Sequence, residues 1–373
     1  MKKEVQPVGS TWGNNLKISV FGESHGAAVG VVIDGLPSGI TLDEGAIAKE
    51  MARRSASGKN LATPRKEADA VEIISGTFNG CTTGTPLTGI ITNTNTKSKD
   101  YNRNVLRPGH ADYTAFRRYQ GFQDHRGGGH FSGRLTAPMV FAGAVCKQVL
   151  AQWKPGVGIG SRIVAIGGVS DAVELPVAAY GQMTFSHPEL PIYDSRLEAA
   201  MRDEILDAMA EEDSVGGIIE GFVTGLPAGV GDPIFDTMES RLASILFGVP
   251  AVKGLEFGTG FAMAAARASE MNDAFYLEDG EVVTHTNHNG GINGGITNGM
   301  PLVFRVAFKP TPSIAATQHT VDIAAGEEVM HSTSGRHDPC IVVRACPVVE
   351  AVTALCILDS LMGAEKWMPF EAK

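Results

Sequence analysis

The chain has 373 residues, of which 43% are hydrophobic and 19% charged, and its formal net charge is −10. This composition supports a large buried core, and the acidic balance argues against general binding to nucleic acid or to a membrane surface. Residues 49–134, however, hold 14 Lys and Arg against 7 Asp and Glu. A basic region in an acidic protein suits a small polyanionic ligand, although a solvated charged face gives the same pattern.

Hydrophobic periodicity predicts strands and helices in mixed order, after a loose lead-in at residues 1–12. Runs rich in β-branched residues predict strands at 16–21, 29–33, 71–74, 87–92, 217–223 and 302–308. Apolar residues at helical spacing predict helices at 42–55, 113–119, 138–153, 196–211, 235–246 and 347–362. Because strands and helices do not alternate strictly, an α+β layered fold is favoured over a doubly wound sheet.

A weak internal repeat divides the chain into two halves. Gly-Leu-Pro-Ser-Gly at 35–39 resembles Gly-Leu-Pro-Ala-Gly at 225–229, and each follows a predicted strand. About a hundred residues after each motif, Ser-Gly-Arg leads into a long apolar helix. We therefore predict one pseudo-duplicated domain spanning residues 1–373, with Arg134 and Arg336 approaching one pocket. Chance similarity between such short motifs is the alternative.

Five short Gly-rich segments each carry a histidine or an arginine. Glycine allows the backbone to approach a ligand closely, histidine titrates near neutrality, and arginine offers a fixed fork of donors to phosphate or carboxylate. Together the segments predict one site for an anionic ligand and for proton transfer, assembled from distant loops. They are residues 22–26, 107–112, 126–130, 287–291 and 334–339.

Several of these residues also have a structural explanation. Asp112 could orient His110 or cap the following helix, and capping is favoured. Successive glycines at 127–129 offer backbone N–H groups to an anion, but neither the Walker spacing nor the Rossmann fingerprint is present. Lys-Pro-Thr-Pro-Ser at 309–313 could hold a phosphate or be a rigid connector. Asp338 could be a general base or a helix-start residue.

A metal site is the less favoured interpretation of the histidines. His285 and His288 are close in sequence but lie in no HExxH or Cys/His ligand pattern. The five cysteines are odd in number and show no CxxC spacing, which predicts reduced thiols in a cytoplasmic protein. Lys2 and Lys3 are not followed by an apolar segment, and no uninterrupted apolar stretch approaches about 18 residues, so neither a signal peptide nor a membrane span is expected.

Taken as an ordered set, the motifs resemble the chorismate synthase family, from about Gly13 to about Leu361. The resemblance implies a β-α-β sandwich assembled as a homotetramer. It also implies conversion of 5-enolpyruvylshikimate-3-phosphate into chorismate and phosphate, a redox-neutral anti-1,4-elimination that requires reduced FMN and ends the shikimate pathway. The segments that carry it are residues 22–26 with 34–37, 107–112, 126–129, 309–313 and 335–340.

The resemblance further implies roles for individual residues. His25 matches the histidine near the flavin, His110 the histidine near the leaving phosphate, and Asp338 the aspartate linked to removal of the C6 proton. Substrate contacts carry over to Arg53, Arg54, Arg107, Arg134 and Arg336. Flavin contacts carry over to His130, Phe131, Ser132, Pro250, Ala251, Gly294, Lys309, Pro310, Thr311, Pro312, Ser313 and Arg336.

Two positions depart from the family pattern. His130 stands where many members carry a flavin-binding arginine. The loop after Arg54 does not align cleanly, because Lys59 or Asn60 occupies the place of a basic residue. The resemblance therefore implies a reduced-nicotinamide site at Arg54 and Asn60 only in outline, and NAD(P)H is expected as an external source of electrons. The competing hypotheses are a metal-dependent phosphatase and a non-catalytic FMN-binding or flavin-reductase module.

Overall fold

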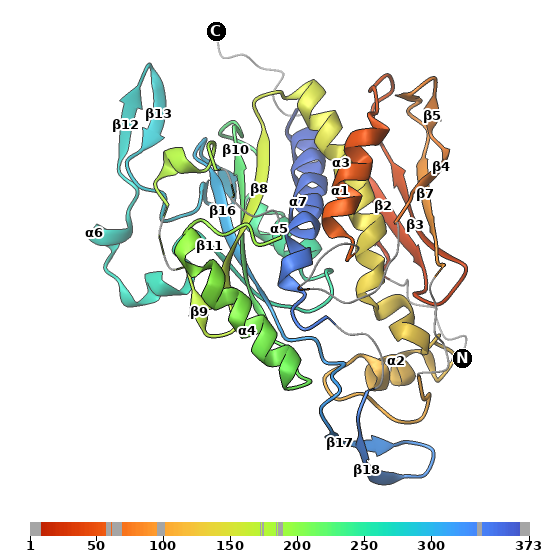
Figure 1. Ribbon diagram of the computed structural model, residues 1–373. Helices are drawn as coiled ribbons and strands as arrows, with labels where there is room; N and C mark the ends of the chain where they lie inside the picture. Colours follow the sequence, from red (N-terminus) through yellow and green to blue (C-terminus); the bar gives the residue numbers. More distant parts are fainter. Residues whose placement is uncertain are drawn as a thin grey trace, which may run out of the picture.

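The computed structural model describes residues 9–56, 61, 69–94, 101–171, 173, 175–183, 185, 189–333 and 338–365. Within these residues the chain forms two five-stranded sheets that face each other across a layer of helices (Figure 1). This arrangement confirms the prediction of an α+β fold built as a β-α-β sandwich.

Both sheets are antiparallel, with the orders β1-β2-β3-β7-β4 and β11-β16-β10-β8-β9. Each sheet packs one face on the helices, so inward side chains alternate along the strands. In β3, for example, Val29, Val31 and Ile33 are fully buried. The first sheet contains β1 (Thr11–Trp12), β2 (Lys17–Gly22), β3 (Ala28–Asp34), β4 (Glu72–Ser75) and β7 (Leu87–Thr92). The second contains β8 (Gly158–Ile166), β9 (Val169–Ser170), β10 (Gly217–Thr224), β11 (Val252–Phe257) and β16 (Leu302–Phe308).

Two long helices, α3 (Thr136–Trp153) and α7 (Val342–Ala364), form the centre of the helical layer. They approach closely at Gly143, where an added Cβ would lie 2.3 Å from the Cα of Ala351. α7 has the length and hydropathy of a membrane span, but 94% of its most apolar window is buried inside the protein. Its hydropathy therefore reflects its place in the core. Further helices are α1 (Glu44–Arg54), α2 (Asp112–Tyr119), α4 (Glu198–Ala210), α5 (Met238–Leu246) and α6 (Ala268–Met271).

The two halves of the fold repeat one topology. In chain order β2, β3, α1, β4, β7 and α3 correspond to β8, β10, α5, β11, β16 and α7. The Gly-Leu-Pro motifs make matching hydrogen bonds: Thr82 Oγ1 donates to the Pro37 carbonyl over 2.6 Å, and Thr297 Oγ1 donates to the Pro227 carbonyl over 2.7 Å. α3 and α7 thus occupy equivalent positions, which confirms the predicted duplication.

Some elements differ from the sequence prediction. The hydrophobic pattern does not predict β8 or β11, and β8 carries the buried polar residues Ser161 and Arg162, which break its apolar run. α7 begins at Val342 rather than at Pro347, which lies inside the helix. Proline has no backbone N–H, so a sequence pattern places it at the start of a helix. Here Pro347 removes only one backbone hydrogen bond near the beginning of a long buried helix.

The structure corrects the predicted loose lead-in for the residues that it describes. Thr11 and Trp12 form β1, which pairs with β2. The buried carboxylate of Asp359 in α7 accepts backbone N–H bonds from Asn15 and Leu16, at 2.6 and 2.7 Å. Strand pairing and a buried acceptor therefore fix this segment against the core.

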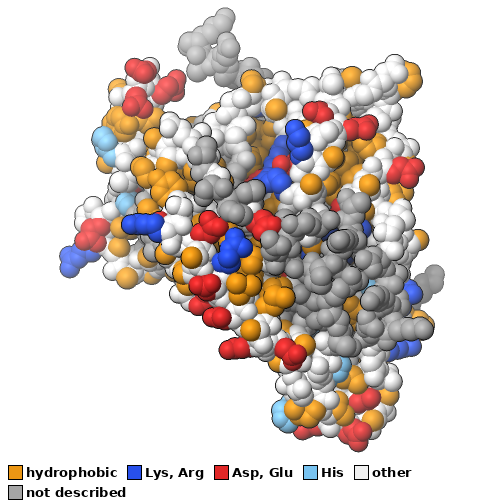
Figure 2. Space-filling model, viewed as in Figure 1, with side chains coloured by type: hydrophobic (Ala, Val, Ile, Leu, Met, Phe, Trp, Pro, Cys, Tyr) orange, Lys and Arg blue, Asp and Glu red, His pale blue; other side chains and the backbone are white. Residues whose placement is uncertain are grey.

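Two-stranded hairpins extend from the sandwich. β12–β13 projects from the side of the second sheet, and β17–β18 projects at one end of the molecule (Figure 1). Figure 2 shows acidic side chains at the tip of the β12–β13 hairpin and hydrophobic side chains along it, where Phe275, Leu277 and Val282 are exposed. The hairpin strands are β5 (Thr77–Phe78), β6 (Cys81–Thr82), β12 (Phe275–Glu278), β13 (Glu281–Thr284), β14 (Ile292–Asn293), β15 (Ile296–Thr297), β17 (Gln318–Asp322) and β18 (Glu327–His331).

Candidate active site

A cavity of about 630 Å³ lies where the two halves meet. The starts of α3 and α7, which are equivalent in the duplication, both contribute to its lining. A helix start carries unpaired backbone N–H groups and the positive end of the helix dipole, so both favour an anionic ligand. The volume is in the range of small-molecule and cofactor sites.

Most of the predicted site residues meet at this cavity. They come from separate stretches of the chain, so the fold brings together residues that the sequence keeps far apart. The predicted residues in the lining are Arg54, Arg107, His110, His130, Phe131, Ser132, Arg134, Pro250, Ala251, Lys309, Thr311, Pro312, Ser313 and Asp338.

Arg54 and Arg134 form a buried cationic pair around one carboxylate. Arg54 Nη1 donates to Asp69 Oδ2 over 2.7 Å, and Arg134 Nη1 donates to the other oxygen. The two arginine side chains are only 6% and 4% exposed. Arg54 also donates to Thr136 Oγ1 and to the Gly133 carbonyl, at 3.1 Å each. These bonds hold its guanidinium in one orientation at the cavity.

The balance of charge in this group favours an incoming anion. Burial lowers the pKa of Arg54 to about 10, and the nearby cations Arg344 and Arg134 act in the same direction while Asp69 opposes them. Burial opposes ionisation of Asp69, but the two guanidiniums hold its pKa below the ordinary value. Asp69 thus bonds two arginines at once, and cationic side chains held at a cavity wall suit a phosphate or carboxylate ligand. No sequence pattern reveals Asp69, since it is a single aspartate in a polar segment.

His110 is oriented by Asp112. Its Nδ1 lies 2.7 Å from Asp112 Oδ1, and Arg107 donates to both oxygens of the same carboxylate. Burial opposes ionisation of Asp112, but its bonds with Arg107 and His110 hold the pKa of the carboxyl well below its usual range. An ionised Asp112 keeps a proton on Nδ1, which leaves Nε2 to exchange protons with a ligand. The favoured capping role is wrong, because Ala111 is the N-cap of α2 and Asp112 bonds to these two side chains.

The glycines at 127–129 pass between the two predicted catalytic histidines. All three have positive φ angles, from 54° to 82°. A Cβ on Gly127 would lie 2.4 Å from His25 Cδ2, and one on Gly128 would lie 3.2 Å from His110 Nε2. Only glycine allows this approach. His25 itself is buried behind Gly127 and makes an edge contact with Tyr101, at 5.3 Å between ring centroids.

Replacing Gly127 with alanine is expected to lower the unfolding free energy by about 2 kcal/mol, because the new Cβ enters a left-handed conformation and overlaps His25. Urea denaturation measures the loss. Gly133→Ala is the matched control, since no heavy atom lies within 4 Å of its added Cβ, and it should change the unfolding free energy by less than about 0.5 kcal/mol. Equal effects of the two substitutions would contradict the packing argument.

The loop after β16 forms another part of the cavity wall. Lys309 Nζ donates to the Gly109 carbonyl, which ties this loop to the His110 loop. Thr311 Oγ1 is buried and has no hydrogen-bond partner among the residues that the structure describes, and Thr311 lines the cavity. A polar atom in this state is available to a ligand. Pro310 does not line the cavity, because its ring packs toward Gly216.

The cavity lining is both cationic and apolar. Its described residues include six basic side chains and two acidic ones, which favours a polyanion. The same cavity has an apolar region that suits a flat ring system. The charged residues are Arg54, Arg107, Arg134, Arg344, Lys253, Lys309, Asp69 and Asp338, and the apolar ones include Phe247, Val249, Pro250, Val252, Ile341 and Val348.

Asp338 is paired with Arg344, a residue that belongs to none of the sequence motifs. Arg344 Nη1 donates to Asp338 Oδ2 over 2.7 Å, and Arg344 Nε donates to the Arg54 carbonyl over 3.0 Å. Arg344 thus links the end of α1 to the start of α7 at the cavity. A charged residue in a mostly apolar helix is the pattern that would have revealed it, since a buried charge requires a partner.

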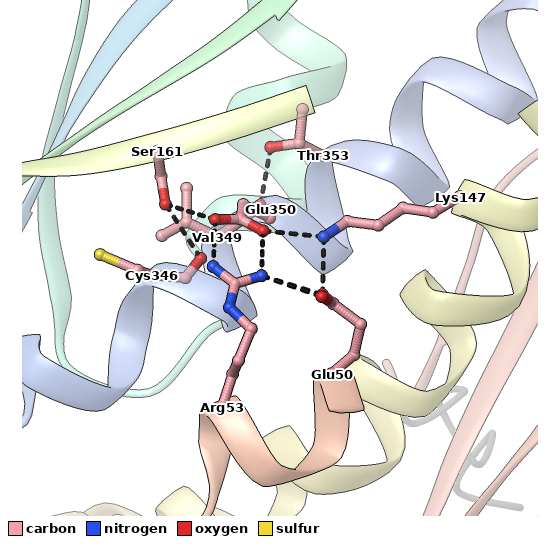
Figure 3. Close-up of polar contacts among 8 residues, drawn as sticks. All are labelled: Glu50, Arg53, Lys147, Ser161, Cys346, Val349, Glu350 and Thr353. Carbon is pink, nitrogen blue, oxygen red and sulfur yellow. Dashed lines mark hydrogen bonds and ion pairs between the residues drawn. The ribbon is translucent and has the colours of Figure 1, made fainter. Parts of the chain in front are cut away.

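Arg53 does not reach the cavity. Its guanidinium binds both carboxylate oxygens of Glu350, at 2.6 and 2.7 Å, and Lys147 Nζ bridges Glu350 and Glu50 (Figure 3). Successive residues of a helix point about 100° apart, so Arg54 faces the cavity while Arg53 faces this cluster. Arg53 therefore fixes α1 against α7, and the structure does not bring it to the predicted substrate site.

Glu350→Gln is expected to lower the unfolding free energy by about 3 kcal/mol at neutral pH. Burial opposes ionisation of Glu350, but Lys147 and Arg53 lower its pKa to about 2 from 4.5. A lowered carboxyl pKa stabilises the fold above the unfolded-state value, so the advantage of the wild type should shrink as pH falls from about 4.5 to about 2.

Urea denaturation of both proteins across this pH range measures the difference. Glu198→Gln is the control, because Glu198 pairs with Arg202 over 3.3 Å within one turn of α4, where both side chains remain partly exposed, and such a pair should contribute less than about 0.5 kcal/mol. A pH-independent difference between wild type and Glu350→Gln would contradict the charge argument.

Other predicted residues lie elsewhere or outside the described chain. Gly294 does not line the cavity. It lies in the turn between β14 and β15, which packs against the start of α5, whereas the cavity lies at the end of that helix. The segment 287–291 packs on Gly258 and does not line the cavity. Arg336 and Asn60 lie outside the described residues.

Comparisons with known proteins place the chain in a family. The family model for chorismate synthase matches residues 16–362. A chorismate synthase of Methanocella arvoryzae is 46% identical over 98% of this chain and 97% of its own length. That of Thermococcus kodakarensis is 46% identical over 95% of this chain and 98% of its own length. A crystal structure of chorismate synthase superposes with a TM-score of 0.73, at 27% identity, over 94% of this chain and 93% of that one. The chain belongs to the chorismate synthase family.

Proposed function

We propose that this protein converts 5-enolpyruvylshikimate-3-phosphate into chorismate and inorganic phosphate by anti-1,4-elimination, the last step of the shikimate pathway. The convergence of His110, Asp338 and the Arg54–Arg134 pair on one cavity carries the proposal. The substrate has a phosphate and two carboxylates, which suit a cavity lined by six basic side chains.

Each group has a distinct task in the elimination. His110, held through Nδ1 by Asp112, gives a proton from Nε2 to the departing phosphate. Arg54, Arg107 and Arg134 bind the anionic groups of the substrate and stabilise the charge that develops on the leaving oxygens. Asp338 takes up the proton released at carbon, and Arg336 is proposed as a further contact on the basis of the family pattern.

Reduced FMN is the proposed cofactor, and the lining of the cavity fits it. Apolar residues such as Phe247 and Val249 suit a ring system, while Lys309 and the Thr311 hydroxyl, which has no partner among the described residues, suit its polar groups. When bound, the reduced flavin supplies electron density to the substrate ring as phosphate departs and recovers it afterwards. His25 is proposed to hold a proton beside the flavin. NAD(P)H is proposed only as an external source of electrons.

His130 is proposed to contact the flavin in place of the more usual arginine. Its Nδ1 lies 2.9 Å from the Gly22 carbonyl and its Nε2 lies 3.2 Å from Ser10 Oγ. The imidazole is therefore fixed on both sides, by the last residue of β2 and by the residue before β1. With both nitrogens engaged, the ring is proposed to contact the flavin through its face or edge. It does not offer the charged pair of donors that an arginine would present.

A cytoplasmic homotetramer, with one domain per chain and no nucleic-acid or membrane partner, is the proposed state of the protein. The exposed side chains of Phe275, Leu277 and Val282 on the β12–β13 hairpin support assembly, since contiguous exposed apolar residues are typical of protein interfaces.

Phosphate release and chorismate formation from 5-enolpyruvylshikimate-3-phosphate test the proposed reaction. Turnover is expected under anaerobic conditions with chemically reduced FMN and not with oxidised FMN or without flavin. Added chelator should leave the rate unchanged. Phosphate release without chorismate, or equal turnover with oxidised FMN, would refute the assignment and favour a phosphatase.

A further inference from the structure

A second cavity, of about 30 Å³, also has His110 in its wall. Because His110 lines both cavities, it lies between the small cavity and the large ligand cavity. The volume is sufficient for one or two water molecules. Asp112, His125 and His331 contribute to the same wall.

Two buried polar atoms at the small cavity have no hydrogen-bond partner in the described part of the chain. They are Thr333 Oγ1 and Gln123 Oε1, and both residues line the cavity. Thr333 is only 3% exposed, so bulk solvent does not solvate its hydroxyl. Buried polar groups are almost always satisfied, by protein or by ordered water. The small cavity therefore has the chemistry of a water site.

His110 must regain a proton after each turnover if it protonates the departing phosphate. Its Nδ1 is engaged by Asp112, so the proton must return to Nε2. The Cε1–Nε2 edge lies 3.2 Å from the Cβ position of Gly128, a residue that lines the small cavity. Substrate and cofactor would exclude water from the large cavity. Water could then reach the imidazole of His110 only from the small cavity.

We propose that the small cavity binds ordered water, held by Thr333 and Gln123, and that this water returns the proton to His110. One proton passes from the water to Nε2, and the water regains a proton from the imidazolium of His125 or His331, which exchanges with solvent. No electrons are transferred and no other bond changes. Other charged or titratable groups around the cavity are Tyr101, Arg103, Arg107, Asp112 and Asp124. The inference rests on the proposed role of His110.

Thr333→Val tests the path, because it removes Oγ1 and keeps the shape of the side chain. The first turnover uses the proton already on His110, so single-turnover phosphate release should stay within about twofold of the wild type. Steady-state turnover should fall about tenfold, because reprotonation becomes slow. Thr333→Ser keeps the hydroxyl and should behave like the wild type, and added imidazole should restore part of the Thr333→Val rate.

Equal losses in single-turnover and steady-state rates, or no loss in either, would overturn the proposal. A high-resolution crystal structure of the holoenzyme gives an independent readout. It should show an ordered water within hydrogen-bond distance of both Thr333 Oγ1 and Gln123 Oε1, and a dry cavity would overturn the water site. The wild-type rate tests the proposed reaction, whereas the ratio of the two rates in the Thr333 variants tests the path.

Discussion

Alanine at position 110 is expected to lower kcat by about 10²- to 10⁴-fold, which is the range of general acid catalysis. Among the described residues that line the cavity, His110 is the only histidine whose imidazole bonds to a carboxylate, and the variant loses it. Departing phosphate would then leave without a positioned proton donor. The KM for substrate should change less, because Arg54 and Arg134 remain in place. Anaerobic steady-state assays with reduced FMN measure both constants.

Two further variants make this result specific. His319→Ala removes an exposed histidine of β17 and should leave kcat within about twofold of the wild type. Asp112→Asn keeps the shape of the orienting side chain but loses its charge, so it should lower kcat about tenfold or more without abolishing substrate binding. Undiminished kcat in His110→Ala would instead favour a module that only binds flavin.

Asp69→Asn is expected to lower the unfolding free energy by about 3 to 5 kcal/mol, because it leaves two buried guanidiniums without their shared carboxylate. The Asp69 side chain is 1% exposed, so solvent cannot replace the lost charge. Inorganic phosphate should recover more stability in this variant than in the wild type, since an anion in the cavity can neutralise the freed arginines. Urea denaturation with and without phosphate measures both effects.

Asp124→Asn is the matched control for this prediction. Asp124 also pairs with an arginine, at 2.7 Å, but the side chain of its partner Arg126 is 44% exposed. A surface pair of this kind contributes less than about 1 kcal/mol, and its loss should not make stability depend on phosphate. Similar losses in Asp69→Asn and Asp124→Asn would show that burial does not determine the strength of these ion pairs.

The sequence motifs predict which residues belong to the site better than they predict which of those residues bond to one another. The motifs predict His110, Arg54 and Arg134 as site residues, and all three line the cavity. The neighbours Arg53 and Arg54 look alike in sequence, yet only the second reaches the cavity. Successive residues of a helix point in different directions, so the two side chains face different surroundings. Arg53 faces Glu350, which lies 297 positions away in the chain. No local pattern encodes a partner at such a distance.

Asp112 illustrates the same limit at short range. A polar residue before a predicted helix is typical of an N-cap, and that interpretation needs only local sequence. The structure instead places the carboxylate of Asp112, the first residue of α2, against Arg107 and His110 of the preceding loop. The local pattern was correct about the helix and wrong about the side chain.

The sequence by itself determined the strands and helices with clear periodicity, the duplication of the two halves and the family, because these depend on residue order and local spacing. Only the tertiary structure decided which charges pair, that Asp69 and Arg344 belong to the site, and that the glycines at 127–129 pack against His25 and His110. The reason is physical: electrostatic and contact energies depend on distances in space, and the fold sets these distances between residues that are far apart in the chain.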